Sequence, residues 1–238
     1  LRAPGGCPWD AEQTHESLRS SLLEETYEVL DALDSNDMTA LEEELGDLLL
    51  QIVFHSVIEE ECSDFTLRDV TTGITNKLIY RHPHVFGSVH VDGTNDVLTN
   101  WEKLKQKEKH QQTVADTLRA VPKAFPALMR SCKIQKRAAR VGFDWDTLPK
   151  VHEEADEVLD ALKKGDAPAI TEEIGDLLFA CVNAARKAGV DPELALAAAT
   201  QKFTNRFIKM EELILSEGGC LSDMTLEQMD SYWDRIKK

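Results

Sequence analysis

One acidic pattern occurs twice in this chain, and it constrains the fold more than any other feature of the sequence. Each copy reads E-E-x-x-E, then fifteen residues, then E-x-x-D. The hexapeptide EVLDAL at 28–33 recurs at 157–162, and all of these matches lie 129 residues apart. A constant offset over such a length indicates duplication of a whole structural unit. The acidic residues are Glu24, Glu25, Glu28, Glu44 and Asp47 in the first copy and Glu153, Glu154, Glu157, Glu173 and Asp176 in the second.

Helical periodicity dominates both copies. Between residues 22 and 33, apolar side chains recur at spacings of three and four, which predicts one apolar helix face. Residues 35–37, Ser-Asn-Asp, predict a tight turn, and Thr39 with Glu42 predicts a capping box that opens the next helix. We therefore expect an all-α protein in which each acidic pattern spans two antiparallel helices.

The duplication also predicts the domain organisation. A chain of 238 residues can hold two units of roughly 110 residues each. We expect an N-terminal domain at 1–110, a proline-punctuated linker at 111–126 and a C-terminal domain at 127–238. A basic amphipathic helix is expected at 128–141. The first copy has no matching helix before its corresponding block, so we expect a further helix upstream of residue 1 in the native protein.

The charge balance excludes one class of partner. The chain has 27 basic and 43 acidic residues, so its net charge of −16 would repel nucleic-acid backbones and anionic membranes. Five scattered cysteines without C-x-x-C spacing predict neither a disulfide framework nor a zinc site, which favours a reducing, cytoplasmic environment. No apolar run approaches the roughly 20 residues of a membrane span.

The acidic pattern is typical of a metal site. Residues three or four apart on a helix share a face, so Glu25 with Glu28 and Glu44 with Asp47 form two carboxylate pairs. A helical hairpin can bring both pairs together, and four converging carboxylates need a cation among them. Carboxylate oxygens favour magnesium, manganese or calcium over zinc, and magnesium keeps water ligands that phosphate oxygens can replace. The pattern therefore predicts metal-dependent hydrolysis of phosphoanhydrides.

Two other interpretations of the carboxylates compete with this site. The first helix of each copy, taken alone, is also explained as a solvated face opposite an apolar stripe. The second helix is apolar nearly all round between Leu45 and Phe54, so Asp47 and Asp176 are expected to be largely buried and to need a partner. A di-iron bundle would require E-x-x-H on its helices, whereas both copies carry E-x-x-D.

Several further blocks, together with the acidic pattern, resemble one protein family. They are GCPWDAEQTHESL near the start, RHPHVFG in the first half and KIQKRAARVGFDWD in the second. Over essentially the whole chain, the combination resembles the MazG family. Its members are two-domain nucleoside triphosphate pyrophosphohydrolases of the all-α NTP pyrophosphatase superfamily. The resemblance implies tandem MazG-like helical-bundle domains and assembly into a homodimer. It also implies cleavage of NTPs or dNTPs to the monophosphate and pyrophosphate, dependent on Mg2+, with Mn2+ as the alternative ion.

Carried over by position, the resemblance implies roles for individual residues. The metal ligands would be Glu154, Glu157, Glu173 and Asp176 in the second half and Glu25, Glu28, Glu44 and Asp47 in the first. Lys202 and Arg206 match positions that meet the triphosphate, and Trp233 matches one near the nucleotide. The competing explanations are a solvated helix edge for the two cations and a core position for the tryptophan.

The two halves differ beside the second-helix aspartate. Asn183 lies seven residues after Asp176, whereas Phe54 has the corresponding place in the first half. Asparagine can hydrogen-bond a ligand or an acidic neighbour, and phenylalanine cannot. We therefore expect the second half to be catalytic, as the resemblance also implies, with Glu153 or Glu154 as general base. One departure from the family pattern is Ala169, where a lysine is often found, so the grip on the substrate can differ.

Two other functions compete with a pyrophosphohydrolase. A catalytically silent helical scaffold or nucleotide-binding regulator would be expected to lose carboxylates, and neither half lacks one of the five. A phosphatase that releases orthophosphate stepwise has no support, because the sequence has no Walker A loop, no histidine-aspartate metal motif and no nucleophile elbow.

Overall fold

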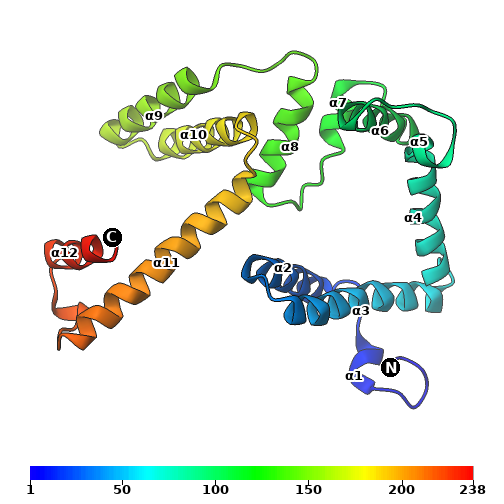
Figure 1. Ribbon diagram of the computed structural model, residues 1–238, viewed down its shortest axis with the longest axis horizontal. Helices are drawn as coiled ribbons and strands as arrows, with labels where there is room; N and C mark the ends of the chain where they lie inside the picture. Colours follow the sequence, from blue (N-terminus) through cyan, green and yellow to red (C-terminus); the bar gives the residue numbers. More distant parts are fainter. Residues whose placement is uncertain (238) are drawn as a thin grey trace. The chain divides into compact units, whose positions relative to one another are not determined.

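Helices account for every regular element over the residues that the structure describes (Figure 1). This computed structural model describes residues 1–237, apart from the side chains at positions 147 and 148. The expected all-α class is therefore confirmed. None of the helices over this range combines the length and apolar character that a membrane-spanning segment requires. The chain forms two compact units, Leu1–Glu108 and the part that begins at Lys109.

The first unit is built around one helical hairpin. Its helices are α1 (Pro8–Glu12), α2 (Arg19–Ser35), α3 (Met38–Cys62), α4 (Leu67–Arg81), α5 (Pro83–Phe86) and α6 (Thr94–Glu108). α2 and α3 form the hairpin, and α4 contacts α3, α5 and α6. Leu18, Phe54 and Ile58 make a small buried core where the chain that enters α2 meets α3.

The second unit contains an equivalent helical hairpin, which two helices, α7 and α8, precede and two, α11 and α12, follow. Its helices are α7 (Val114–Arg119), α8 (Ala127–Ala139), α9 (Thr147–Lys164), α10 (Ala167–Lys187), α11 (Pro192–Ser216), the 3-10 turn Leu221–Asp223 and α12 (Leu226–Ile236). α9 and α10 form the hairpin, and α8 packs against α10 and α11. In Figure 1, α11 diverges from the hairpin, and α12 lies beside the far end of α11.

The segment expected as a linker, residues 111–126, contains helix α7. A capping box of Thr113 and Asp116 begins this helix, which explains why a polar stretch becomes helical. Arg137 of α8 donates a hydrogen bond to the backbone carbonyl of Thr117, so α7 is attached to α8. The segment is thus part of the second unit, and the division falls after Glu108. The expected limits of the two domains, 1–110 and 127–238, stay predictions.

The two hairpins turn at equivalent residues. Asn36 and Gly165, 129 residues apart, adopt left-handed φ angles of 56° and 69°, a conformation that asparagine and glycine tolerate best. In each copy the next residue is an aspartate that caps the second helix; Asp37 accepts a hydrogen bond from the backbone N–H of Thr39. The expected capping box of Thr39 and Glu42 is therefore wrong, because Asp37 takes the N-cap position.

Much of the apolar surface of both hairpins is exposed in the single chain. Leu49 on α3 and Ile174 and Leu178 on α10 are among these side chains. α3 is apolar nearly all round, but its hairpin partner covers only part of its surface. Asp47 on α3 and Asp176 at the equivalent position on α10 are both exposed. The expectation that both are largely buried is therefore wrong for the single chain.

Candidate metal centre

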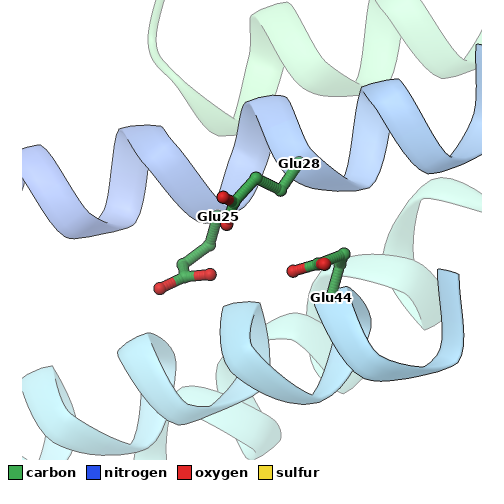
Figure 2. A group of neighbouring side chains, drawn as sticks. All are labelled: Glu25, Glu28 and Glu44. Carbon is green, nitrogen blue, oxygen red and sulfur yellow. The ribbon is translucent and has the colours of Figure 1, made fainter. Parts of the chain in front are cut away.

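Three glutamates converge between the helices of the first hairpin. Figure 2 shows Glu25 and Glu28 on α2 facing Glu44 on α3. One carboxylate oxygen of each residue lies within 4.8 Å of the other two. The spacing of three residues places Glu25 and Glu28 on one face of α2, and the tight turn brings Glu44 opposite. Three of the four carboxylates expected to converge therefore lie together, and Asp47 is not in this group.

Burial and mutual repulsion disturb the ionisation of this cluster. Burial is the largest cause that raises the pKa of Glu25 and of Glu44, and the charges of neighbouring carboxylates, Glu28 and Asp47 among them, raise it further. Asp47 is exposed and outside the three-glutamate group, but its charge acts on that group. A cation would relieve this repulsion.

The second hairpin carries the equivalent cluster. Glu154 and Glu157 on α9 and Glu173 on α10 each place a carboxylate oxygen within 4.8 Å of the others. Glu154 is 5% exposed, so a charged residue is almost fully buried. The pKa of Glu157 is raised, first by burial and then by its hydrogen bond with Glu154 and nearby negative charges. Asp176 is exposed and lies outside this group.

Lys150 is a site residue that the sequence analysis missed. Its ammonium nitrogen lies 2.7 Å from Glu154 Oε1 and 3.2 Å from Glu153 Oε2. Hydrogen bonds with these two carboxylates raise the pKa of Lys150. The signal was present as a lysine four residues before Glu154, a spacing that supports helix ion pairs. The first copy has Ser21 at the matching position, so only the second cluster has its own cation.

The donor atoms of both clusters suit a hard divalent cation. Each cluster offers carboxylate oxygens only, which magnesium, manganese and calcium prefer and zinc does not. Burial first, and then the negative charge of neighbouring carboxylates, raise the pKa values of Glu25, Glu44 and Glu157, and a bound cation would offset both effects. The residues present therefore fit the expected metal.

Asn183 has a different environment from the one expected. It is 2% exposed, and its side-chain oxygen accepts a hydrogen bond of 2.5 Å from Arg186. Arg186 also contacts Asp144 at 2.5 Å, so Asn183 helps to fasten the GFDWD block onto α10. Phe54, its counterpart, lies in the apolar core of the first unit. The difference between the halves is real, but the partner of Asn183 is an arginine.

Lys202, Arg206 and Trp233 lie apart from the glutamate cluster in the single chain. Lys202 is exposed and Arg206 is half-buried on α11, which diverges from the α9–α10 hairpin (Figure 1). Trp233 on α12 packs against Phe203, with ring centroids 5.3 Å apart. The structure thus places Trp233 against the residue that follows Lys202 on α11, and it leaves Lys202, Arg206 and Trp233 outside the carboxylate group.

Comparison with models of known protein families identifies the family of this chain. The model that matches describes the MazG nucleotide pyrophosphohydrolase domain, and it matches twice, at residues 13–86 and 145–210. Each match contains one complete glutamate cluster. The chain belongs to the MazG family. Its two hairpins are therefore the cores of tandem MazG domains, as the duplication predicts.

Three known proteins are similar to this chain over its full length. A nucleoside triphosphate pyrophosphohydrolase of Escherichia coli strain K12 is 44% identical, and the alignment covers 100% of this chain and 93% of that protein. A Thermotoga maritima protein named nucleoside triphosphate pyrophosphohydrolase/pyrophosphatase MazG is also 44% identical, with 100% and 91% covered. An uncharacterized Bacillus subtilis protein is 45% identical, but this chain covers only 50% of it.

Proposed function

We propose that this protein hydrolyses nucleoside triphosphates, NTPs or dNTPs, to the nucleoside monophosphate and pyrophosphate. The observation that carries the proposal is the cluster of Glu154, Glu157 and Glu173, which lies within a matched MazG domain. Relatives that align over more than nine-tenths of their length are named for this activity.

Mg2+ is the ion that we propose for the cluster, with Mn2+ as the alternative. When bound, it would neutralise phosphate charge and lower the pKa of an attacking water. Glu154 and Glu157 from α9 and Glu173 and Asp176 from α10 would hold it. Glu153 or Glu154 would accept the proton of the water, and Lys150 keeps both carboxylates in a fixed position beforehand.

A homodimer would complete this site. Lys202 and Arg206 would stabilise charge on the triphosphate, and Trp233 would lie near the nucleotide. Because α11 diverges from its own hairpin, a partner chain is the simplest source of a closed pocket (Figure 1). The exposed Ile174 and Leu178 of α10 support this, since a second chain would cover them.

The second half is proposed as the catalytic one. Its cluster has Lys150 beside Glu154, and Asn183 with Arg186 fixes the loop that leads into α9. The first half has Ser21 and Phe54 at the matching positions. A cytoplasmic location also belongs to the proposal, and the five free cysteines support it.

The deciding assay separates the products formed from each NTP and dNTP in the presence of Mg2+. Monophosphate and pyrophosphate are the expected products. Stepwise release of orthophosphate would indicate a phosphatase, and absence of turnover a catalytically silent scaffold. Either of those two results would overturn the proposed function.

A matched pair of variants tests the assignment to the second half. Glu154→Gln removes a proposed metal ligand, so kcat should fall by at least about 100-fold, because a bound metal contributes several kcal/mol to the transition state. Glu25→Gln makes the same change in the first half and should keep most of the activity. The opposite pattern would reverse the assignment between the halves.

A further inference from the structure

Arg81, which corresponds in the first half to Arg206 in the second, already has an anionic partner. Arg81 ends α4, and its side chain is 8% exposed. Glu108, the last residue of α6, accepts a hydrogen bond from Arg81 Nε at 2.8 Å and forms an ion pair with Nη2 at 2.7 Å. Both contacts involve the same carboxylate oxygen. A nearly buried guanidinium is therefore neutralised by a residue 27 positions away in the chain.

Trp101, which corresponds in the first half to Trp233, also has cations of the protein against its ring. The guanidinium of Arg81 lies 5.2 Å from the centre of the Trp101 ring, and the ammonium of Lys105 lies 4.8 Å from it. Cations at these distances bind to the face of an aromatic ring. The ring surface on which a base could stack is thus taken up by the protein's own cations.

The corresponding residues of the second half are arranged differently. Lys202 and Arg206 have the same four-residue spacing as Lys77 and Arg81. Over the part of the chain that the structure describes, neither Lys202 nor Arg206 forms an ion pair, and Trp233 contacts Phe203 in place of a cation. The cations of the second half are therefore free to take an anion from solution.

A carboxylate and a phosphate compete for the same guanidinium donors. Both are oxyanions that match the planar fork of arginine, so the one already bound has to leave before the other can bind. Separating this pair is costly on the arginine side, because Arg81 is buried while Glu108 is 34% exposed, and loss of the carboxylate leaves an uncompensated charge in the protein. A triphosphate that approaches Arg81 would face this cost, and one that approaches Arg206 would not.

We propose that Glu108 is a built-in anion that occupies Arg81 and excludes the triphosphate from the first half. Glu108 is thereby a specificity-determining residue, since it selects which of two similar domains takes the substrate. The inference rests on the proposed function in one respect, namely that the lysine and arginine pair of each half faces the triphosphate. A contact that only ties α6 to α4 would predict no gain of anion binding when Glu108 is changed.

The test measures binding of magnesium tripolyphosphate to the full chain by titration calorimetry. The second half is silenced by Lys202→Met with Arg206→Met, and this background should bind the probe weakly. Adding Glu108→Gln should strengthen binding at least about tenfold, because Arg81 is left without its anion. A further Arg81→Met change should abolish that gain.

The matched control is Asp96→Asn, which removes one negative charge from the same helix about 18 Å along its axis from Glu108. It should leave binding at the background level. No gain in a folded Glu108→Gln protein, or a gain that survives Arg81→Met, would overturn the proposal. If the glutamine variant does not fold, Glu108→Ala, which lets water reach Arg81, is measured against the same criteria.

Failure of this inference and failure of the proposed function are distinguishable. Turnover of NTPs by the unmodified protein decides the proposed function and does not involve Glu108. Binding of tripolyphosphate decides the role of Glu108 and requires no turnover. A protein without NTP hydrolysis that gains binding through Glu108→Gln would refute the function and support the inference.

Discussion

Among individual residues, the glutamates of each cluster lie close enough for their negative charges to repel one another. Burial and neighbouring negative charge raise the pKa values of Glu25, Glu44 and Glu157 above the ordinary value of 4.5. Lys150 lies 2.7 Å from Glu154 in the second cluster, and the first cluster has Ser21 at the matching position. The clusters therefore resemble sites prepared for metal rather than solvated helix faces.

The raised pKa values of these glutamates predict how the stability of the protein depends on pH. Where the folded pKa is raised, the group contributes stability below about pH 4.5, and this contribution is lost as pH rises through the folded pKa. Metal-free protein should therefore lose thermal stability from these groups as pH rises above about 4.5. Adding Mg2+ at pH 7 should raise the melting temperature, which differential scanning fluorimetry in EDTA or Mg2+ can measure.

Replacing Glu157 by Gln supplies the control for this prediction. At pH 7 without metal, the variant should melt higher than the unmodified protein, and its gain on adding Mg2+ should be smaller. Glu60→Gln, on an exposed part of α3, should change neither value appreciably. A metal-free Glu157→Gln protein that melts lower at pH 7 would show that repulsion is not the controlling effect.

Among the elements, α12 is fastened to the end of α11 by one carboxylate. Glu217 accepts hydrogen bonds from Arg235 at 2.6 Å and from the Tyr232 hydroxyl at 2.7 Å. These contacts, with Arg235 as the main cause, lower the pKa of Glu217 to about 2. The attachment holds α12 where Trp233 packs on Phe203. Its effect on function would pass through the position of that tryptophan.

Glu217→Gln should therefore loosen α12 without touching the glutamate cluster. We expect KM for the nucleotide to rise about two- to fivefold, in line with the small contribution of exposed ion pairs, while kcat changes little. Tryptophan fluorescence should show a more solvated Trp233. Asp234→Asn alters only a local pair with Lys237 on the same helix and serves as the control. A fall in kcat at unchanged KM would contradict a positioning role.

For the whole molecule, the exposed apolar surface is larger than a single chain of this kind needs. Leu159 and Leu178 on the second hairpin and Phe203 and Phe207 on α11 are all exposed. Trp233 of α12 packs on Phe203, yet Phe203 stays exposed. Surfaces of this kind usually mark an interface between chains. Leu178 follows the proposed metal ligand Asp176 by two residues, and Phe203 adjoins the proposed triphosphate residue Lys202, so assembly and activity should be coupled.

Leu178→Glu tests that coupling. A buried charge in the interface should convert a dimer, of twice 26.7 kDa, into a 26.7 kDa monomer in light scattering after gel filtration, and activity should be lost with it. Val141→Glu introduces the same charge at an exposed apolar residue in a loop and should leave the dimer intact. A monomeric unmodified protein with full activity would refute the coupling.

The sequence predicted a large part of the fold and of the site. Both hairpins, their turns and the six clustered glutamates follow from helical spacing and from turn residues, which act over a few positions in the chain. The N-cap of α3 was assigned to the wrong residue, because Asp37 and Thr39 are both suitable capping residues. The helical α7 was missed, because a polar, proline-bounded stretch is also typical of a linker.

The sequence by itself determined where the carboxylates lie, since their positions depend on local helix geometry and on an exact duplication. Only the tertiary structure decided which charges have partners. It exposes Asp47 and Asp176 in the single chain, and it joins Arg81 to Glu108 across 27 residues. Such contacts depend on how distant helices pack, so spacing along the chain does not reveal them. The doubled pattern thus specifies two similar frames, and packing makes them chemically different.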